Sequence, residues 1–114
     1  MSLAFCKGVI LLTNFLAHIQ WVSYDNGGRK SLPEIGVTYY PHIILDKDIS
    51  RTSWSIAFTV VPCDCDRKCT ISFRMLVDND GTRQFAAGMC SGDLFGLYEG
   101  KRLVAQGAIV EIAK

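Results

Sequence analysis

The sequence predicts an all-β domain, a closed barrel or a sandwich, from three observations. Apolar and polar residues alternate with period two over several segments of strand length. Turn-forming residues separate these segments. Glycines recur through the C-terminal third, where they suit tight turns and barrel corners and disfavour helices; they are Gly88, Gly92, Gly96, Gly100 and Gly107.

Length and composition indicate a single domain over residues 1–114. The chain has 114 residues, of which 49% are hydrophobic, enough for one modest core. Its net charge of +1 excludes a charge-rich disordered chain and gives no general attraction to nucleic acid or an anionic membrane, so any basic site must be local. Residues 1–3 are expected to be an added leader without structural weight.

An apolar N-terminal run over residues 3–22 is the one segment that resembles a membrane signal. Lys7, Asn14, His18 and Gln20 interrupt it, and its longest apolar stretch is far shorter than the roughly 20 residues that a spanning helix needs. We therefore expect no membrane association. An odd number of cysteines, five, also favours a reducing compartment, and the expected location is cytoplasmic.

Two patterns compete in this N-terminal segment. Leu12, Phe15, Leu16 and Ile19 have the i, i+3, i+4, i+7 spacing of a helix face. Residues 18–21 alternate as a strand does, so helix and strand both stay open. The segment at residues 25–28, Asp-Asn-Gly-Gly, predicts a turn, and residues 29–33 predict a loop.

Three strands are predicted in the middle of the chain. Residues 37–45 are rich in β-formers, with Pro41 marking an edge, a bulge or a strand start. In the second strand one face is formed by Trp54, Ile56, Phe58 and Val60. In the third, over residues 70–77, the inward face is expected to be Ile71, Phe73, Met75 and Val77.

A C-terminal hairpin is predicted from residues 94–98 and 103–112, joined by a short polar link in which Gly100 supplies a positive φ. In a regular register Val104 and Ile112 fall on the outer face of this hairpin. Such an exposed apolar pair favours self-association into a homo-oligomer.

Three motifs resemble the C-terminal β-barrel domain of elongation factor Tu. They are GGRK at residues 27–30, YPHI at residues 40–43 and FGLYEGKRLVAQG at residues 95–107. The family has a GGR loop before a YRP strand and closes its fold with an F-x-I-R-E-G-x-x-x-V-G-x-G hairpin, in the same order. The resemblance covers most of the chain and implies a six-stranded antiparallel Greek-key β-barrel.

The resemblance also limits the expected function. Tyr40 and Tyr98 stand where the family has arginines, so two of the family's polar contacts do not carry over. The chain has no G-x-x-x-x-G-K-[ST] loop and is too short for a GTPase domain, which excludes GTP hydrolysis. In the translation factor this barrel helps to hold transfer RNA and protein partners. The resemblance therefore implies a stand-alone, non-catalytic binding module for a protein or RNA partner.

Basic pairs and tyrosines are the candidate binding residues. Three basic pairs lie in predicted loops: Arg29 with Lys30, Arg67 with Lys68, and Lys101 with Arg102. Charge beside aromatic surface is the combination that binds single-stranded RNA. The alternative is that the charges simply keep the domain soluble. The predicted binding residues are Arg29, Lys30, Tyr39, Tyr40, Tyr98, Lys101 and Arg102.

A second hypothesis rests on three thiols within seven residues, Cys63, Cys65 and Cys69. Thiolates bind zinc, but a structural site needs four ligands, and the fourth would have to be Cys90, Cys6, His18 or His42. A redox-responsive loop is the other functional alternative, and free thiols in a charged turn are the simplest. Cys6 and Cys90 are expected to be small core residues.

Other chemistry finds little support. Residues 78–81, Asp-Asn-Asp-Gly, resemble the start of a calcium loop, but Arg83 and Met89 stand where that loop needs Gly and Glu, so a strand-to-strand turn is expected. Cys90 with His18 or His42 has no catalytic signature around it. No glycine-rich phosphate loop is present. We expect neither an enzyme nor a cofactor.

Overall fold

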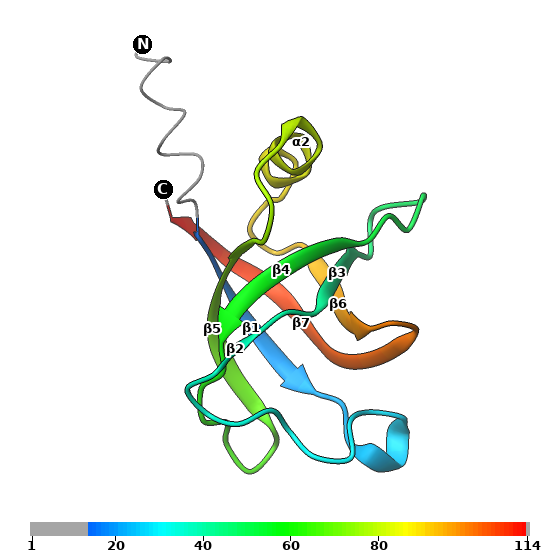
Figure 1. Ribbon diagram of the computed structural model, residues 1–114, viewed down its shortest axis with the longest axis vertical. Helices are drawn as coiled ribbons and strands as arrows, with labels where there is room; N and C mark the ends of the chain where they lie inside the picture. The colour runs from blue at the N-terminus through cyan, green and yellow to red at the C-terminus, as the bar shows by residue number, and fades with distance from the viewer. Residues whose placement is uncertain (1–13, 114) are drawn as a thin grey trace.

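A computed structural model describes residues 14–113 and shows a closed antiparallel β-barrel (Figure 1). Around the ring the strand order is β1, β5, β4, β3, β6, β7, with every neighbouring pair antiparallel and β4 paired to β5 to close the circle. This confirms the predicted fold class. The six strands are β1 (Asn14–Trp21), β3 (His42–Leu45), β4 (Trp54–Thr59), β5 (Lys68–Met75), β6 (Leu94–Glu99) and β7 (Arg102–Ala113).

The connectivity is that of a Greek key. Strands β3, β4 and β5 follow one another in sequence and pair in that order. β1, which precedes them, lies on the far side of β5, so a long connection through the 3-10 helix η1 (Tyr24–Asn26) crosses one end of the barrel. The helix α2 (Asp80–Ala87) lies at the opposite end (Figure 1).

A short strand, β2 (Thr38–Tyr39), continues β3 along the same edge of β4. The pairs Thr38 with Thr59 and His42 with Ser55 belong to one continuous register. Pro41 interrupts the ladder because it has no N–H, although its carbonyl still accepts from the Ile56 amide at 3.0 Å. Of the three possibilities for Pro41, an edge, a bulge or a strand start, the structure shows a strand start, because β3 begins at His42.

The N-terminal segment is a strand, which decides between the two patterns that it carries. Phe15, Ala17, Ile19 and Trp21 are buried, and β1 bonds to β5 on one side and to β7 on the other. The hydrogen bonds that β1 makes to two neighbouring strands stabilise it more than the helix-like spacing of its apolar residues could stabilise a helix, because tertiary pairing overrides weak local propensity. Leu12 lies outside the described residues.

The core is built on three contacting phenylalanines, each at most 2% exposed: Phe15 stacks on Phe73, and Phe95 meets Phe73 edge-on. Val104 is also fully buried and Ile112 packs against the core, so the expectation that both lie on the outer face was wrong. β7 contains two register shifts, one against β6 and one against β1. Each extra residue reverses the alternation locally. Since Val104 is buried and Ile112 is half-buried, the two do not form the exposed apolar pair predicted for self-association.

The segment at residues 78–81 begins a helix, so the predicted strand-to-strand turn was wrong. The Asn79 side chain accepts from the Thr82 amide at 2.9 Å, and the Thr82 hydroxyl accepts from the Asn79 amide at 2.9 Å, a reciprocal cap that starts α2. α2 is held to the barrel by Phe85, which stacks on Trp54 at 5.4 Å. Because β5 ends at Met75, Val77 is half exposed instead of inward. No helix among residues 14–113 has the length and apolarity to cross a bilayer.

Candidate functional site

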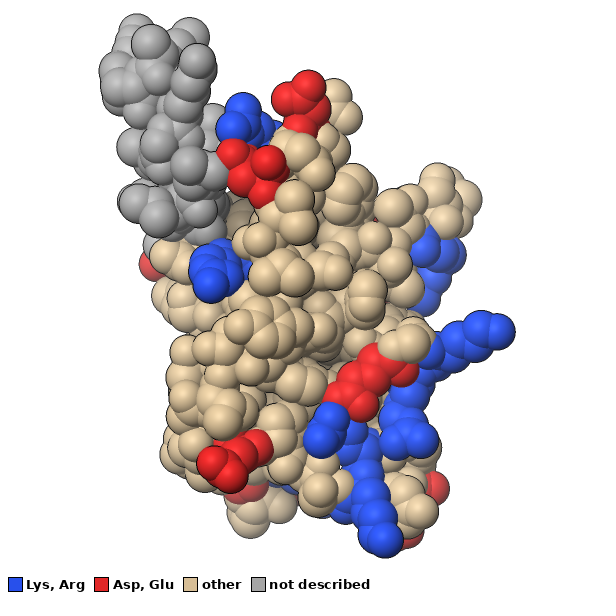
Figure 2. All heavy atoms as spheres, viewed as in Figure 1, with Lys and Arg blue, Asp and Glu red and all other residues tan. Residues whose placement is uncertain are grey.

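Basic side chains gather on one side of the barrel (Figure 2). Contacts and strand register place five of them around the end of β6: Arg29 bonds to Glu99, Arg51 bonds to Tyr98, Arg102 pairs across from Glu99, and Lys30 and Lys101 are the chain neighbours of Arg29 and Arg102. We call this surface the basic face. Arg29 and Lys30 come from the connection between β1 and β2, and Arg51 from the loop between β3 and β4. Lys101 lies in the turn between β6 and β7, and Arg102 is the first residue of β7. The structure thus brings together two of the three basic pairs that the sequence singles out.

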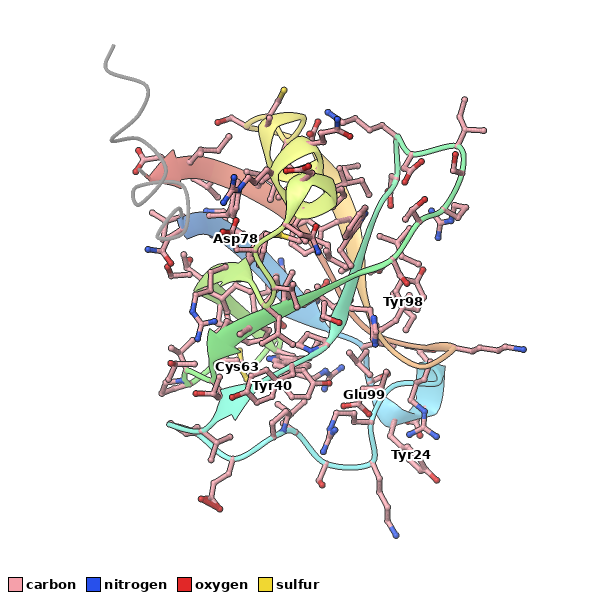
Figure 3. The ribbon with its side chains drawn as sticks, turned by 45° about the horizontal axis from the view of Figure 1, so that its top comes forward. Tyr24, Tyr40, Cys63, Asp78, Tyr98 and Glu99 are labelled. Carbon is pink, nitrogen blue, oxygen red and sulfur yellow. The ribbon has the colours of Figure 1, made fainter. Side chains whose placement is uncertain are left out.

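At the centre of the basic face the Glu99 carboxylate joins two of these connections. It accepts hydrogen bonds from the Arg29 guanidinium and from the Tyr39 hydroxyl. The Arg29 guanidinium carbon lies 5.7 Å from the centre of the Tyr39 ring, and its Nε donates to the Ser31 carbonyl at 2.8 Å. We call Arg29, Tyr39 and Glu99 the Glu99 cluster. Figure 3 shows Glu99 beside the turn between β6 and β7.

Electrostatics keep the Glu99 cluster charged. Burial raises the pKa of Glu99, but the hydrogen bonds from Tyr39 and Arg29 and the nearby charges of Arg29 and Arg102 outweigh it and hold that pKa below its usual value. Burial and the Glu99 charge raise the pKa of the Tyr39 hydroxyl, so it stays a hydrogen-bond donor. Glu99 is therefore an anion near neutral pH, and Arg29 neutralises it.

Local packing explains why the Glu99 cluster forms. Tyr39 is held by Trp21, whose ring lies 5.7 Å away, and by an edge-to-face contact with Phe58 at 5.6 Å. Gly28 lets the chain before Arg29 fold against Val22, since a Cβ there would lie 2.0 Å from the Val22 carbonyl oxygen. The aromatic cluster and this close turn place Arg29 over Tyr39.

The remaining cations of the basic face are available to a ligand. Lys30, Lys101 and Arg102 are exposed, and none takes part in the three ion pairs found within residues 14–113. Arg51 donates to the Tyr98 hydroxyl at 3.2 Å. The sequence did not single out Arg51, because it is an isolated charge in its predicted loop. Its partner in the fold, Tyr98, lies far from it along the chain.

The predicted tyrosines divide between two roles. Tyr39 faces the barrel end and belongs to the Glu99 cluster. Tyr98 pairs across the sheet with His42. Tyr40 lies two residues before His42, so its side chain points to the same outer side of the sheet, and it is 55% exposed. Tyr98, which is bonded to Arg51, and Tyr40, on the same outer side of the sheet, are thus the aromatic candidates of this surface.

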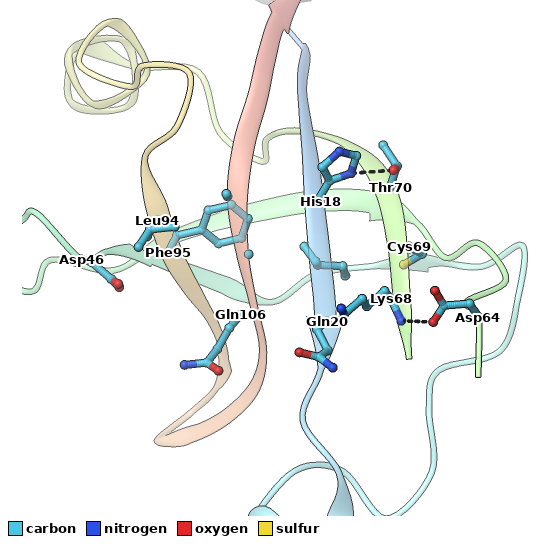
Figure 4. A pocket seen from close by; sticks show the side chains of 13 residues that line it. His18, Gln20, Asp46, Asp64, Lys68, Cys69, Thr70, Leu94, Phe95 and Gln106 are labelled. Atoms are coloured by element: carbon cyan, nitrogen blue, oxygen red, sulfur yellow. Dashed lines mark hydrogen bonds between the residues drawn. The ribbon is translucent and has the colours of Figure 1, made fainter. Parts of the chain in front are cut away.

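A groove of about 690 Å³ lies away from the basic face, on the outer side of β5, β1, β7 and β6 (Figure 4). His18 Nδ1 lies 2.8 Å from the Thr70 hydroxyl in its wall. Gln20, Lys68, Leu94 and Gln106 also line it. Among the residues of the predicted basic pairs, only Lys68 lines this groove. The groove therefore lies apart from the basic face.

The cysteines do not assemble a metal centre in the described part of the chain. Within residues 14–113 no three His, Cys, Asp or Glu side chains gather so that they could hold a metal ion. Cys63, Cys65, Cys69 and Cys90 are free thiols. Cys90 is exposed after α2, not in the core as expected, because its amide is held by the Asp93 carboxylate at 2.8 Å in a surface turn. Cys6 lies outside the described residues.

The acidic residues before α2 have structural partners. The Asp78 carboxylate accepts two hydrogen bonds from Arg83, at 2.7 and 2.6 Å, and Asn79 caps the helix. Figure 3 shows Asp78 well apart from Glu99, near α2. This segment is part of the helix start.

No protein-family model matches the chain, and no curated protein sequence matches it. The likeness to elongation factor Tu therefore stays a prediction from the sequence motifs.

Replacing Glu99 by glutamine is expected to lower the free energy of unfolding by about 1–2 kcal/mol near neutral pH, because the Tyr39 and Arg29 donors lose a charged acceptor. A carboxyl with a lowered pKa stabilises the fold above its unfolded pKa of about 4.3, and this stability is lost as pH falls through the folded pKa. Glu99→Gln should therefore weaken the acid dependence of stability.

Urea unfolding at neutral and acidic pH measures both effects. Glu111→Gln, at an exposed position of β7, is the matched control and should leave stability unchanged. A Glu99→Gln variant as stable as the parent protein at neutral pH would contradict the role given to the Glu99 cluster.

Proposed function

We propose that this protein is a non-catalytic binding module whose basic face binds single-stranded RNA. The observation that carries the proposal is that Arg29, Lys30, Arg51, Lys101 and Arg102 gather around Tyr98 and Glu99 in a chain whose net charge is only +1. Charges that merely kept the protein soluble would have no reason to gather from three connections.

The chemistry of the basic face suits a nucleic-acid strand. Lys30, Lys101 and Arg102 are exposed and able to contact phosphates, and such contacts provide most of the affinity for nucleic acid. Tyr40 offers an exposed ring on which a base can stack. Because Arg29 neutralises Glu99, the central carboxylate does not cancel the charge of the remaining cations.

The test is RNA binding by the triple variant Lys30→Ala, Lys101→Ala, Arg102→Ala, followed by the anisotropy of a labelled mixed-sequence RNA oligonucleotide over a range of salt concentrations. We expect a loss of affinity of at least about tenfold at low salt. The slope of log affinity against log salt should become shallower by about two, since each phosphate contact on a single strand contributes about 0.7.

A second triple variant, Arg67→Ala, Lys68→Ala, Arg74→Ala, removes the same charge from exposed positions outside the basic face and should bind within about threefold of the parent protein. Equal losses in the two variants, or no RNA binding by the parent at low salt, would overturn the proposal. Binding of a polyglutamate peptide as tightly as RNA would also overturn it and would indicate an acidic protein partner.

A further inference from the structure

The connection between β4 and β5 contains two thiols that RNA binding does not use. Cys63 and Cys69 flank a tight turn, and both are partly buried and packed against the core. Figure 3 labels Cys63 and Figure 4 labels Cys69, at the start of β5. Cys65 lies within the turn and is exposed.

Hydrogen bonds define the geometry of this turn. The Arg67 amide donates to the Asp64 carbonyl at 2.9 Å, and the Asp64 amide donates to the Lys68 carbonyl at 3.0 Å. Arg67 has a positive φ of 63°. This is a three-residue hairpin loop, a type I turn followed by a left-handed residue. The Asp64 side chain also accepts from the amides of Asp66 and Lys68, both at 2.9 Å, which fixes the loop further.

Continuing the hairpin by one residue sets Cys63 opposite Cys69, and the two lie near enough for Cys63 to raise the pKa of the Cys69 thiol. Asp64 and Lys68 form the hydrogen-bonded pair that closes the loop, so the next residues outward, Cys63 and Cys69, take the position of a non-hydrogen-bonded pair. In such pairs the Cα atoms lie about 4.5 Å apart, within the range of about 4.4–6.8 Å that a disulfide needs. Both side chains face the core, so both sulfurs are on the same side of the hairpin.

We propose that Cys63 and Cys69 form a reversible intramolecular disulfide when the protein meets a disulfide oxidant such as glutathione disulfide. One cysteine thiolate attacks the glutathione S–S bond and releases one glutathione. The second thiolate then attacks the mixed disulfide and releases another. The two cysteines lose two hydrogens and gain one S–S bond, and glutathione disulfide is reduced to two glutathiones.

The surroundings of Cys69 indicate that this reaction is slow at neutral pH. Burial, together with the nearby Cys63 and Asp64, raises the pKa of the Cys69 thiol, although the Trp21 indole opposes the shift. Only the thiolate reacts, so oxidation should accelerate as pH rises. We therefore expect the Cys63–Cys69 pair to exchange slowly with glutathione and glutathione disulfide at neutral pH.

The experiment incubates the folded full-length protein with glutathione disulfide, blocks remaining thiols and digests with trypsin. Cleavage after Arg67 and Lys68 separates Cys63 from Cys69, so the disulfide would hold peptides 52–67 and 69–74 together until reduction. A variant with Cys6, Cys65 and Cys90 replaced by serine should form the same linked pair and become two hydrogens lighter.

Matched variants decide the assignment. Cys65→Ser should leave the rate of oxidation within about twofold of the parent, whereas Cys63→Ser should stop at a glutathione adduct on Cys69 or not react. A linked peptide that persists in Cys63→Ser but disappears in Cys65→Ser would overturn the proposal. So would a parent protein that yields only glutathione adducts or intermolecular dimers.

Discussion

Replacing Phe73 by alanine is expected to remove about 3–5 kcal/mol of the free energy of unfolding. The Phe73 side chain is fully buried, stacks on Phe15 at 5.1 Å and meets Phe95 edge-on at 6.1 Å. Its loss leaves a cavity beside Phe15 and Phe95, which the hydrogen-bonded strands of the barrel close only partly. Because small domains have only about 5–15 kcal/mol in total, this loss is a large fraction of the free energy of unfolding.

Urea unfolding followed by far-ultraviolet circular dichroism measures this loss. Leu94→Ala is the control, because Leu94 is apolar but 57% exposed on β6 and its removal should cost less than about 1 kcal/mol. Phe73→Leu should recover most of the stability by refilling the site. A loss below about 1 kcal/mol in Phe73→Ala would show that Phe73 is not at the centre of the core.

Replacing Gly107 by alanine is the second large expected effect, a loss of about 1–3 kcal/mol from overpacking. A Cβ at Gly107 would lie 2.4 Å from the His18 carbonyl oxygen, 2.8 Å from Ile19 Cγ2 and 2.9 Å from Phe95 Cζ. The first of these contacts is backbone and part of the ladder between β1 and β7, so it cannot rotate away. The two strands must separate locally to admit the methyl group.

Gly88→Ala is a matched glycine control. Gly88 has a φ of −86°, and a Cβ there would make only ordinary contacts at 3.6 and 3.7 Å. It should be neutral or slightly stabilising because alanine restricts the unfolded chain. If both alanine variants unfold at the same urea concentration, the close approach at Gly107 has no energetic consequence.

Strand positions were predictable where local pattern and tertiary environment agree. The alternation around Phe73, the inward positions of Ile56 and Phe58 and the turn at Gly100 appear in the structure as predicted, whereas Ala57 between them is buried as well. β1 remained ambiguous because its residues satisfy both periods, and only its two partner strands decide. α2 was missed because Asn79 suits a turn as well as a helix cap, and Thr82 completes the cap in place of the more usual Glu or Gln.

The candidate site was predictable in its components but not in its assembly. Charged pairs and tyrosines are visible in the sequence, whereas the closeness of Arg29 to Glu99, 70 residues apart, depends on barrel closure. Glu99 was interpreted only as part of a polar turn, although it links that turn to Tyr39. The burial of Val104 followed from a bulge, which shifts the face of a strand by one residue without a distinct sequence signal.

The pairing of β1 with β7 has a consequence for synthesis of the protein. Asn14 lies opposite Ala113, so one edge of β1 receives its partner only after nearly the whole described chain has been made. Chains emerge from the ribosome from the N-terminus at about 5–20 residues per second, so for several seconds the nascent β1 lacks β7. During that interval its unpaired backbone groups are open to other chains or to a chaperone. The finished ring removes this hazard by covering both edges of its first strand.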